Sequence, residues 1–213
     1  MFKFAGRLLI GIACLLPAMG VSADRLILIP TGDTLTTGGI RAEYQQKLDA
    51  SDGNMSRVNI GISRFEIEGA RFQDFGSENA TAVSAQISVL PETSVTPAIA
   101  LGVRDLSDET DGLGMPYDGR SLYLAASKSI PVTGGIPLIF KNVKVHGGIG
   151  TGSLHGVFFG VEGKLPLGVR LAGEFDSEKL NAMLSYNVVP TLRVDLGVIR
   201  SDTYVGAQFG TKF

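Results

Sequence analysis

The sequence predicts an all-β protein, an antiparallel up-and-down transmembrane β-barrel of about twelve strands, with ten strands as the alternative. Three observations predict this fold. Apolar and polar residues alternate with a period of two in many short segments, which is typical of strands with one apolar and one polar face. No uninterrupted apolar run approaches the roughly 18 residues of a membrane helix. The segment before the alternating part has the composition of a secretory signal.

The composition narrows the possible partners. The 213 residues are enough for one domain, and they carry a net charge of −2 with no run of Lys and Arg. A nucleic-acid partner is therefore not expected. Charged residues make up only 19% of the chain, which fits a soluble β-sandwich or a barrel whose lipid-facing residues are spread over many strands.

The first 23 residues are expected to be a signal peptide. Lys3 and Arg7 form a short positive region, an apolar core follows, and the small residues at its end predict cleavage between Ala23 and Asp24. The apolar core is short for an uncleaved anchor helix. The predicted destination is the outer membrane, with the periplasm or secretion as the alternative.

The only cysteine, Cys14, lies inside this signal segment. A lipoprotein signal usually has Leu three residues before its cysteine, whereas this chain has Gly11 there, so lipidation is not expected. After cleavage the chain would hold no cysteine, and therefore no disulfide and no thiolate metal site.

The remaining chain divides into a lead-in segment, 24–37, and a barrel, 38–213. The lead-in combines a short apolar stretch with a Pro-Thr-Gly-Asp turn. Alternation then predicts strands at 38–47, 57–62, 65–73, 81–90, 95–105, 120–129, 140–150, 156–164, 168–175, 180–188, 191–200 and 203–213. Twelve is an even number, as is usual for membrane barrels built from one chain.

The connections between these strands fall into two alternating classes. Tight or proline-containing connections are predicted at 63–64, 91–94, 130–139, 165–167 and 189–190. Mostly polar connections are predicted at 48–56, 74–80, 106–119, 151–155, 176–179 and 201–202. Outer-membrane barrels place short turns in the periplasm and longer loops outside the cell, so the second class is expected on the outer side.

The last strand alternates Val205, Ala207 and Phe209 with Gly206 and Gln208. An alternating final strand with a terminal aromatic residue resembles the closing strand of bacterial outer-membrane barrels. The resemblance implies that Phe209 and Phe213 belong to a signal read by the barrel-assembly machinery.

The polar faces of the predicted strands carry charges of both signs. In a membrane barrel the apolar face contacts outer-membrane lipid and the polar face lines the lumen, because every backbone group in hydrocarbon needs an internal partner. The candidate lumen-facing charges are Arg41, Glu43, Glu66, Glu68, Arg104, Lys144, Glu162, Lys164, Arg170, Glu174, Arg193 and Asp195. A soluble sandwich would instead expose this face to water.

Several segments resemble the barrel domains of the YjbH-like family. They are IPTGDTLTTGG (29–39), VNIGISRFEIEG (58–69), LGVRDL (101–106), YDGRSLYLAASK (117–128), GVFFGVEG (156–163) and VRLAGEFDSEKLN (169–181). The resemblance implies a role in producing or secreting exopolysaccharide. Many members are longer and lipidated, and no functional residue carries over to this chain.

No residue pattern predicts catalysis, a metal site or a cofactor. An outer-membrane phospholipase would need a His–Ser pair on the lipid-facing wall, but His146 falls on the lumen face with no Ser closely following in phase. His155, near Ser153, falls in a loop. The Gly-rich 147–156 lacks the Lys-Ser/Thr ending of a phosphate-binding loop.

An acidic loop offers one further candidate for ligand binding. Asp105, Asp108, Glu109 and Asp111 could hold Ca²⁺, but their spacing is not that of an EF-hand, and a solvated loop is the simpler interpretation.

Two hypotheses of function follow from the sequence. The first is a small outer-membrane barrel that acts as a narrow channel or as part of an envelope export system, with exopolysaccharide as the cargo that the resemblance implies. The second is a secreted or periplasmic β-sandwich that binds a ligand through its loops. The first predicts an integral membrane protein and the second a soluble one.

Overall fold

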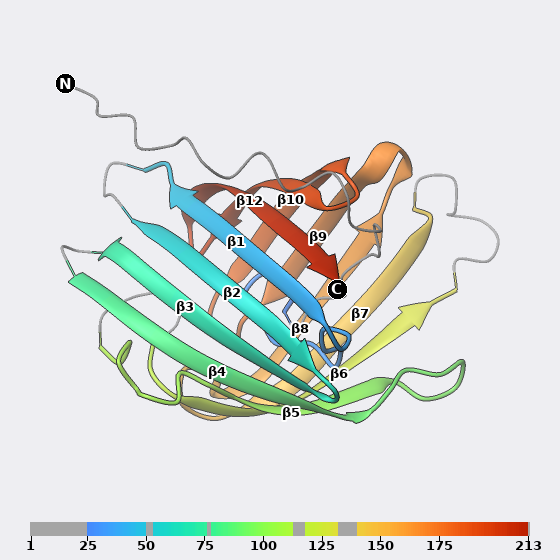
Figure 1. Ribbon diagram of the computed structural model, residues 1–213, viewed down its shortest axis with the longest axis horizontal. Helices are drawn as coiled ribbons and strands as arrows, with labels where there is room; N and C mark the ends of the chain where they lie inside the picture. Colours follow the sequence, from blue (N-terminus) through green and yellow to red (C-terminus); the bar gives the residue numbers. More distant parts are fainter. Residues whose placement is uncertain (1–24, 50–52, 76–77, 113–117, 132–139, 213) are drawn as a thin grey trace.

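Twelve antiparallel strands close into a ring in the computed structural model of the protein (Figure 1). The structure describes residues 25–49, 53–75, 78–112, 118–131 and 140–212. The predicted signal peptide, its predicted cleavage site and Phe213 lie outside these residues. The strands are β1 (Gly39–Lys47), β2 (Asn54–Ile62), β3 (Phe65–Phe75), β4 (Glu78–Leu90), β5 (Ala98–Arg104), β6 (Ser121–Ile130), β7 (Asn142–Gly150), β8 (Gly156–Lys164), β9 (Val169–Phe175), β10 (Leu180–Val189), β11 (Leu192–Ile199) and β12 (Asp202–Lys212), with two 3-10 turns, η1 (Gly152–Leu154) and η2 (Pro166–Gly168).

Each strand pairs with its neighbours in the sequence, and β1 also pairs with β12. The β1–β12 ladder runs from Gly39 opposite Lys212 to Lys47 opposite Tyr204. A closed ring leaves no unpaired sheet edge. The prediction of twelve strands is confirmed, and the ten-strand alternative is wrong. The closure also rules out the two-sheet sandwich.

The predicted strand boundaries differ from the structure mainly at the starts of β2, β4 and β5, and β4 begins at Glu78 rather than at 81. β2 begins at Asn54 rather than at 57, because Asn54, Met55 and Ser56 also pair with β1 and extend the ladder. The strand expected to begin at 95 begins at Ala98. Thr93 accounts for this difference, because its Oγ1 accepts hydrogen bonds from the N–H groups of Val95 and Thr96, which fold the chain into a turn.

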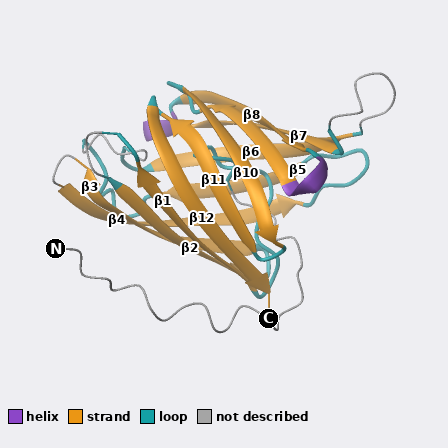
Figure 2. Ribbon diagram, turned by 90° about the horizontal axis from the view of Figure 1, so that it is seen from above, coloured by secondary structure: helices purple, strands orange, loops and turns teal. Residues whose placement is uncertain are grey.

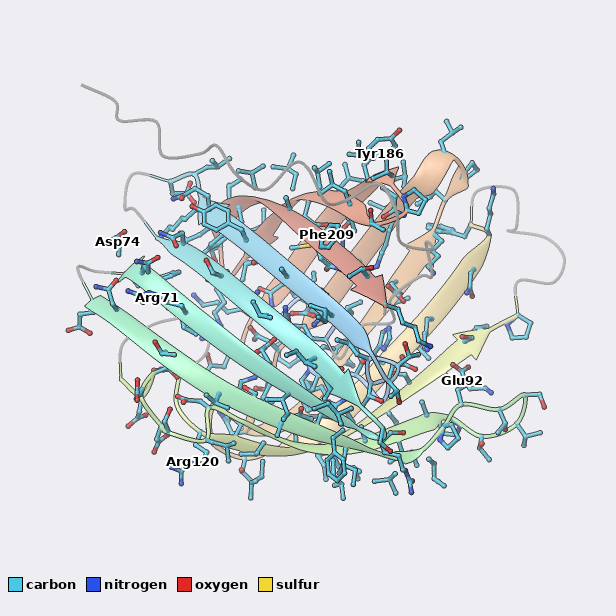
Figure 3. The ribbon with its side chains drawn as sticks, in the orientation of Figure 1. Arg71, Asp74, Glu92, Arg120, Tyr186 and Phe209 are labelled. Carbon is cyan, nitrogen blue, oxygen red and sulfur yellow. The ribbon has the colours of Figure 1, made fainter. Side chains whose placement is uncertain are left out.

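The connections sort to the two ends of the barrel as predicted. The tight connections lie at the end where β1 begins and β12 ends, which we call the turn end, and the others lie at the opposite loop end. Ser63 makes the β2–β3 connection with a positive φ of 57°. Figure 3 shows Glu92 at the turn end and Asp74, Arg71 and Arg120 at the loop end, and Figure 2 shows the ring from a second direction.

The barrel is apolar outside and polar inside. On β2, Val58 and Ile60 are exposed, whereas the neighbouring Arg57 and Asn59 are buried. The same alternation runs around the ring, and its exposed members include Ile62, Ile67, Val83, Leu101, Leu122, Leu124, Ile149, Val157, Phe159, Val161, Leu171, Leu184, Tyr186, Val194, Leu196, Val198 and Val205. A protein surface in water rarely carries so large a continuous apolar area. Among the described residues, no helix has the length and apolarity to span a membrane.

Candidate functional site: a lumen closed by residues 25–37

The chain that precedes β1 turns into the barrel and fills its lumen (Figure 1, blue). We call residues 25–37 the lumen segment. Its first part forms a tight turn, with a β-bridge between Arg25 and Pro30 and a 3.0 Å hydrogen bond from the Leu26 N–H to the Ile29 carbonyl. The side chains from Leu26 to Ile29 are at most 4% exposed. Residues 25–35 of the predicted lead-in are therefore part of the barrel interior, whereas Thr36 and Thr37 are exposed.

One carboxylate, that of Glu174 on β9, binds the backbone of this turn. The Leu28 N–H donates to Glu174 Oε1 at 2.7 Å, and the Ile27 N–H donates to Oε2 at 2.8 Å. The Ile29 N–H reaches both oxygens at 3.3 Å, and Asn181 Nδ2 donates to Oε1 at 3.0 Å. Hydrogen bonds to a charged acceptor are stronger than those between neutral groups. Glu174 is thus the main anchor of the lumen segment.

Other polar groups of the wall satisfy the carbonyls of the same turn. Arg104 donates from Nη2 to the Leu28 carbonyl, and Arg170 donates from Nη2 to the Leu26 carbonyl at 3.5 Å. The apolar side chains of the turn pack against apolar lumen residues, among them Met55, Ala70, Phe72, Ala125, Phe158, Ala172 and Met183. A four-residue apolar stretch can therefore sit in a polar lumen, because its backbone groups and side chains find different partners.

Ion pairs around Arg25 join the lumen segment to the barrel wall. Its guanidinium pairs with Glu43 at 2.9 Å and also with Glu68. Arg57 pairs with Glu43 at 2.8 Å, and Arg41 lies 3.8 Å from Glu66. These side chains come from β1, β2, β3 and the lumen segment, so the network joins the segment to one side of the wall. A buried charge without such partners would be strongly destabilising.

The second half of the lumen segment is held by side chains of β3, β4 and β7. Asp33 pairs with Lys144 at 2.7 Å, and its carbonyl accepts from Gln86 Nε2 at 2.6 Å. The Leu35 N–H donates to Glu66 Oε2 at 2.7 Å. Contacts on several strands fix the segment along its length.

Gly32 fits where no side chain could. Its N–H donates to Ser127 Oγ at 2.8 Å. A Cβ at this position would lie 2.3 Å from the Ala98 carbonyl oxygen, which is backbone and cannot move aside. The lumen segment therefore approaches the wall closely only because residue 32 is glycine.

The twelve candidate lumen charges lie at different depths. Eight are buried, namely Arg41, Glu43, Glu66, Glu68, Arg104, Arg170, Glu174 and Asp195. Lys144, Glu162 and Arg193 are half-buried, and Lys164 is exposed at the turn end.

Sequence reasoning missed two buried charges of the interior, Arg57 and Arg25. Alternation with Val58 could have indicated Arg57, but no local signal indicated Arg25. Phe209 lies in β12 opposite Ala42 and Leu192.

His146 has a serine partner that the sequence did not reveal. Ser127 lies opposite it in the β6–β7 ladder, and the Ser127 Oγ is 2.7 Å from His146 Nδ1. Glu162 Oε1 lies 3.9 Å from His146 Nε2. These residue types can form a nucleophilic triad, but Ser127 is 1% exposed and also accepts from the Gly32 N–H. The lumen segment therefore covers the hydroxyl, and Ser127 Oγ serves as the hydrogen-bond partner of both His146 and the Gly32 N–H.

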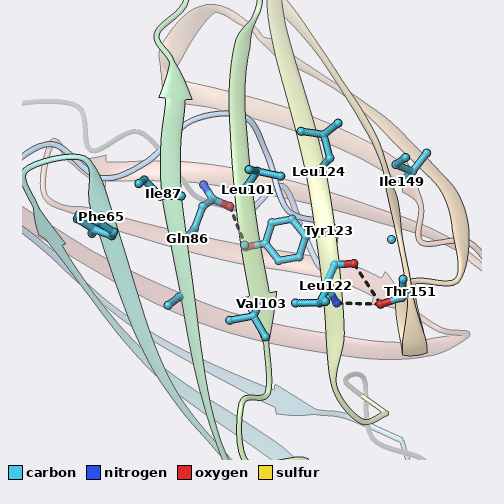
Figure 4. Close-up of a pocket in the computed structure, with 13 residues that line it drawn as sticks. Phe65, Gln86, Ile87, Leu101, Val103, Leu122, Tyr123, Leu124, Ile149 and Thr151 are labelled. Atoms are coloured by element: carbon cyan, nitrogen blue, oxygen red, sulfur yellow. Dashed lines mark hydrogen bonds between the residues drawn. The ribbon is translucent and has the colours of Figure 1, made fainter.

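The outer wall carries a shallow apolar groove of about 600 Å³ over β3 to β7 (Figure 4). Its apolar lining includes Phe65, Leu101 and Leu124. Its polar members are paired, since the Tyr123 hydroxyl donates to Gln86 Oε1 at 2.9 Å. The groove therefore offers contact area for apolar chains and no free polar group for chemistry.

The acidic loop after β5 uses its carboxylates to hold its own backbone. Asp108 Oδ1 accepts from the Arg120 N–H at 2.6 Å. Asp105 accepts from the Thr110 hydroxyl at 2.6 Å and from the Thr110 N–H at 2.9 Å. In the described part of the chain, no three His, Cys, Asp or Glu side chains gather as metal ligands would.

We expect the order of this loop to depend on pH. Burial raises the pKa of Asp105, but the hydrogen bonds from Thr110 and Ser107 outweigh it and hold the pKa below its ordinary 3.8. A lowered pKa means that the carboxylate stabilises the folded loop above about pH 4 and that this stability is lost as the pH falls through the folded value. The protection of the Thr110 amide, measured as its exchange rate relative to that of an unstructured amide at the same pH, should therefore fall at low pH. Asp105→Asn should lower this protection about tenfold at pH 7 and remove its pH dependence. Wild-type protection in that variant would contradict the assignment.

Comparisons with known proteins add little to this geometry. No protein-family model matches the chain, and no curated protein matches it. Among solved structures, a mutant porin of Rh. blastica is similar with a TM-score of 0.33 and 13% identity, over 74% of this chain and 55% of the porin. The chain thus spans about half the length of that porin, and so distant a similarity carries no argument about function. The resemblance to YjbH-like barrels stays a prediction.

Proposed function

We propose that this chain is an integral outer-membrane β-barrel whose lumen is closed by residues 25–37, and that it acts as a narrow channel only when this segment moves. The observation that carries the proposal is the polarity of the barrel. Its exposed surface is a belt of Val, Leu, Ile and aromatic side chains, and most of its candidate lumen charges are buried inside. Hydrocarbon stabilises this arrangement and water does not.

The proposed orientation follows from the connections. The turn end, where β1 begins and β12 ends, faces the periplasm, and the longer loops face outward. The proposal includes cleavage of the signal peptide before Asp24 and recognition of β12, with Phe209 and Phe213, by the assembly machinery. Mass spectrometry of the mature protein tests the cleavage.

The closed lumen limits what the barrel can transport. Ion pairs and hydrogen bonds link the lumen segment to β1, β3, β6, β7 and β9. A polymer such as exopolysaccharide could pass only after the whole segment had left the lumen. We therefore favour a barrel that is shut at rest, and a role in export would need a partner that removes the segment.

Fractionation tests the membrane assignment. We expect the protein to stay with outer membranes through a carbonate wash and to migrate differently in SDS gels before and after boiling. Release into the soluble fraction with no change in migration would exclude the membrane assignment and favour a periplasmic or secreted binding protein.

A further inference from the structure

We propose that the turn-end mouth of the lumen is a binding site for a small anion that carries a phosphate or carboxylate group. The site is a polar cavity of about 350 Å³, which is within the range of small-ligand sites. It lies between the strands β7 to β12, and its charged lining residues are Lys141, Glu162, Lys164, Arg170 and Arg193. The inference stands whether or not the barrel conducts ions.

The cavity has an excess of positive charge. Four of these five side chains are cationic, and Glu162 is the one acidic residue of the lining. Glu162 pairs with Arg170 Nε, so its charge is already engaged. Lys141 and Lys164 are exposed and remain in solvent at the rim. A cleft lined by one sign of charge attracts small ions of the opposite sign.

Arg170 is the buried centre of the site. It is 8% exposed, and its Nη2 is 3.5 Å from the Leu26 carbonyl of the lumen segment. Its Nη1 is buried and has no hydrogen-bond partner among the described residues. Leaving a buried charged donor without a partner is destabilising. An anion in the cavity, which Arg170 lines, would compensate the positive charge of this guanidinium.

Arg193 provides the second guanidinium. Its Nη2 donates to Gln208 Oε1 at 2.6 Å, and its Nε lies 2.9 Å from Asp195 Oδ1, so its orientation is fixed. Both arginines line the same cavity, where their like charges repel each other. Guanidinium groups bind phosphate and carboxylate in a planar, two-point manner, which suits this pair better than a halide ion.

Arg170 lies between this cavity and the lumen segment, because it lines the cavity and also contacts the Leu26 carbonyl. Because Arg170 contacts the Leu26 carbonyl, a ligand that enters from the mouth meets the lumen segment rather than an open pore. The site therefore suits a small solute or a single headgroup and not a polymer.

Calorimetry on the full-length protein in a non-ionic detergent tests the proposal. Inorganic phosphate and acetate test whether the protein binds free anions, and a short-chain phosphatidylglycerol tests whether it binds a lipid headgroup. All are measured at constant ionic strength. We expect phosphate or acetate to bind, with Arg170→Gln and Arg193→Gln each weakening affinity about tenfold or more. Glu162→Gln should instead tighten binding severalfold, because it removes the opposing charge and frees Arg170 Nε.

Arg120→Gln is the matched control, because it removes one exposed arginine at the loop end. It should leave the affinity unchanged.

If Arg170→Gln does not fold, as judged by migration in unboiled gels, then Lys164→Gln at the exposed rim should still weaken binding about threefold. Binding of phosphatidylglycerol but not of free anions would show that the bound phosphate group belongs to a lipid headgroup. No binding of any probe, or weaker binding in Glu162→Gln, would overturn the proposal. Absence from the membrane fraction would overturn the proposed function and not this site.

Discussion

Replacing Glu174 with alanine is expected to release the lumen segment and to raise the ion conductance of the barrel. The carboxylate accepts hydrogen bonds from the N–H groups of Ile27, Leu28 and Ile29. Each buried donor left without a partner costs about 1–3 kcal/mol. A total on the order of 3 kcal/mol would raise the population of the displaced segment roughly a hundredfold. Single-channel recordings in planar bilayers should show at least a tenfold rise in mean conductance.

A second variant separates steric from electrostatic effects. Gly32→Val changes no charge, but its side chain would meet the backbone of Ala98, so it should also displace the segment and raise conductance. Glu109→Gln is the control, since Glu109 is exposed in a loop and its loss should change nothing. Wild-type conductance in both Glu174→Ala and Gly32→Val would mean that residues 25–37 do not block the lumen.

Replacing Leu184 with arginine is expected to impair membrane insertion strongly. Leu184 lies near the middle of β10, is 45% exposed, and has Leu171 and Leu196 as neighbours on the adjacent strands. Arginine on the lipid face costs about 2–4 kcal/mol at the bilayer midplane. If water surrounded the barrel, the same change would cost less than about 0.5 kcal/mol. Folding into lipid vesicles, followed by denaturant titration, measures the difference.

Leu180→Arg provides the matched comparison on the same strand and face. Leu180 is the first residue of β10, at the loop end, and is 74% exposed. A charge near the membrane interface costs only about 0–1 kcal/mol, so this variant should insert almost normally. Equal stability of the two variants would show that no hydrocarbon surrounds β10 and would remove the membrane assignment.

The strands could be predicted because their signal is local. Alternation along β8 identified its bounds, Gly156–Lys164, without reference to any other strand. The start of β5 was misplaced because Val95 continues the apolar alternation, while the Thr93 side chain folds the same residues into a turn. A side-chain hydrogen bond can compete with strand pairing, and the alternation of apolar and polar residues does not reveal it.

The contents of the lumen could not be predicted, because they depend on contacts between distant residues. Ile27 and Glu174 are 147 positions apart in the sequence. The run from Leu26 to Ile29 has no polar residue to suggest what its backbone binds. Ser127 meets His146 only through the register of the β6–β7 ladder. Polarity along a strand indicates which face a residue occupies but not which residue lies opposite.

The ladder between β1 and β12 has a consequence for the order of folding. Each of the other ladders joins strands that are consecutive in the sequence, and closing such short loops costs little entropy. The β1–β12 ladder joins the two ends of the barrel sequence, so it should form late. Residues 25–37 directly precede β1, and their partners lie on strands around the curled sheet. We therefore expect the ring to close and the interior to fill in one cooperative late step, with interior substitutions slowing this step and leaving earlier hairpin formation unchanged.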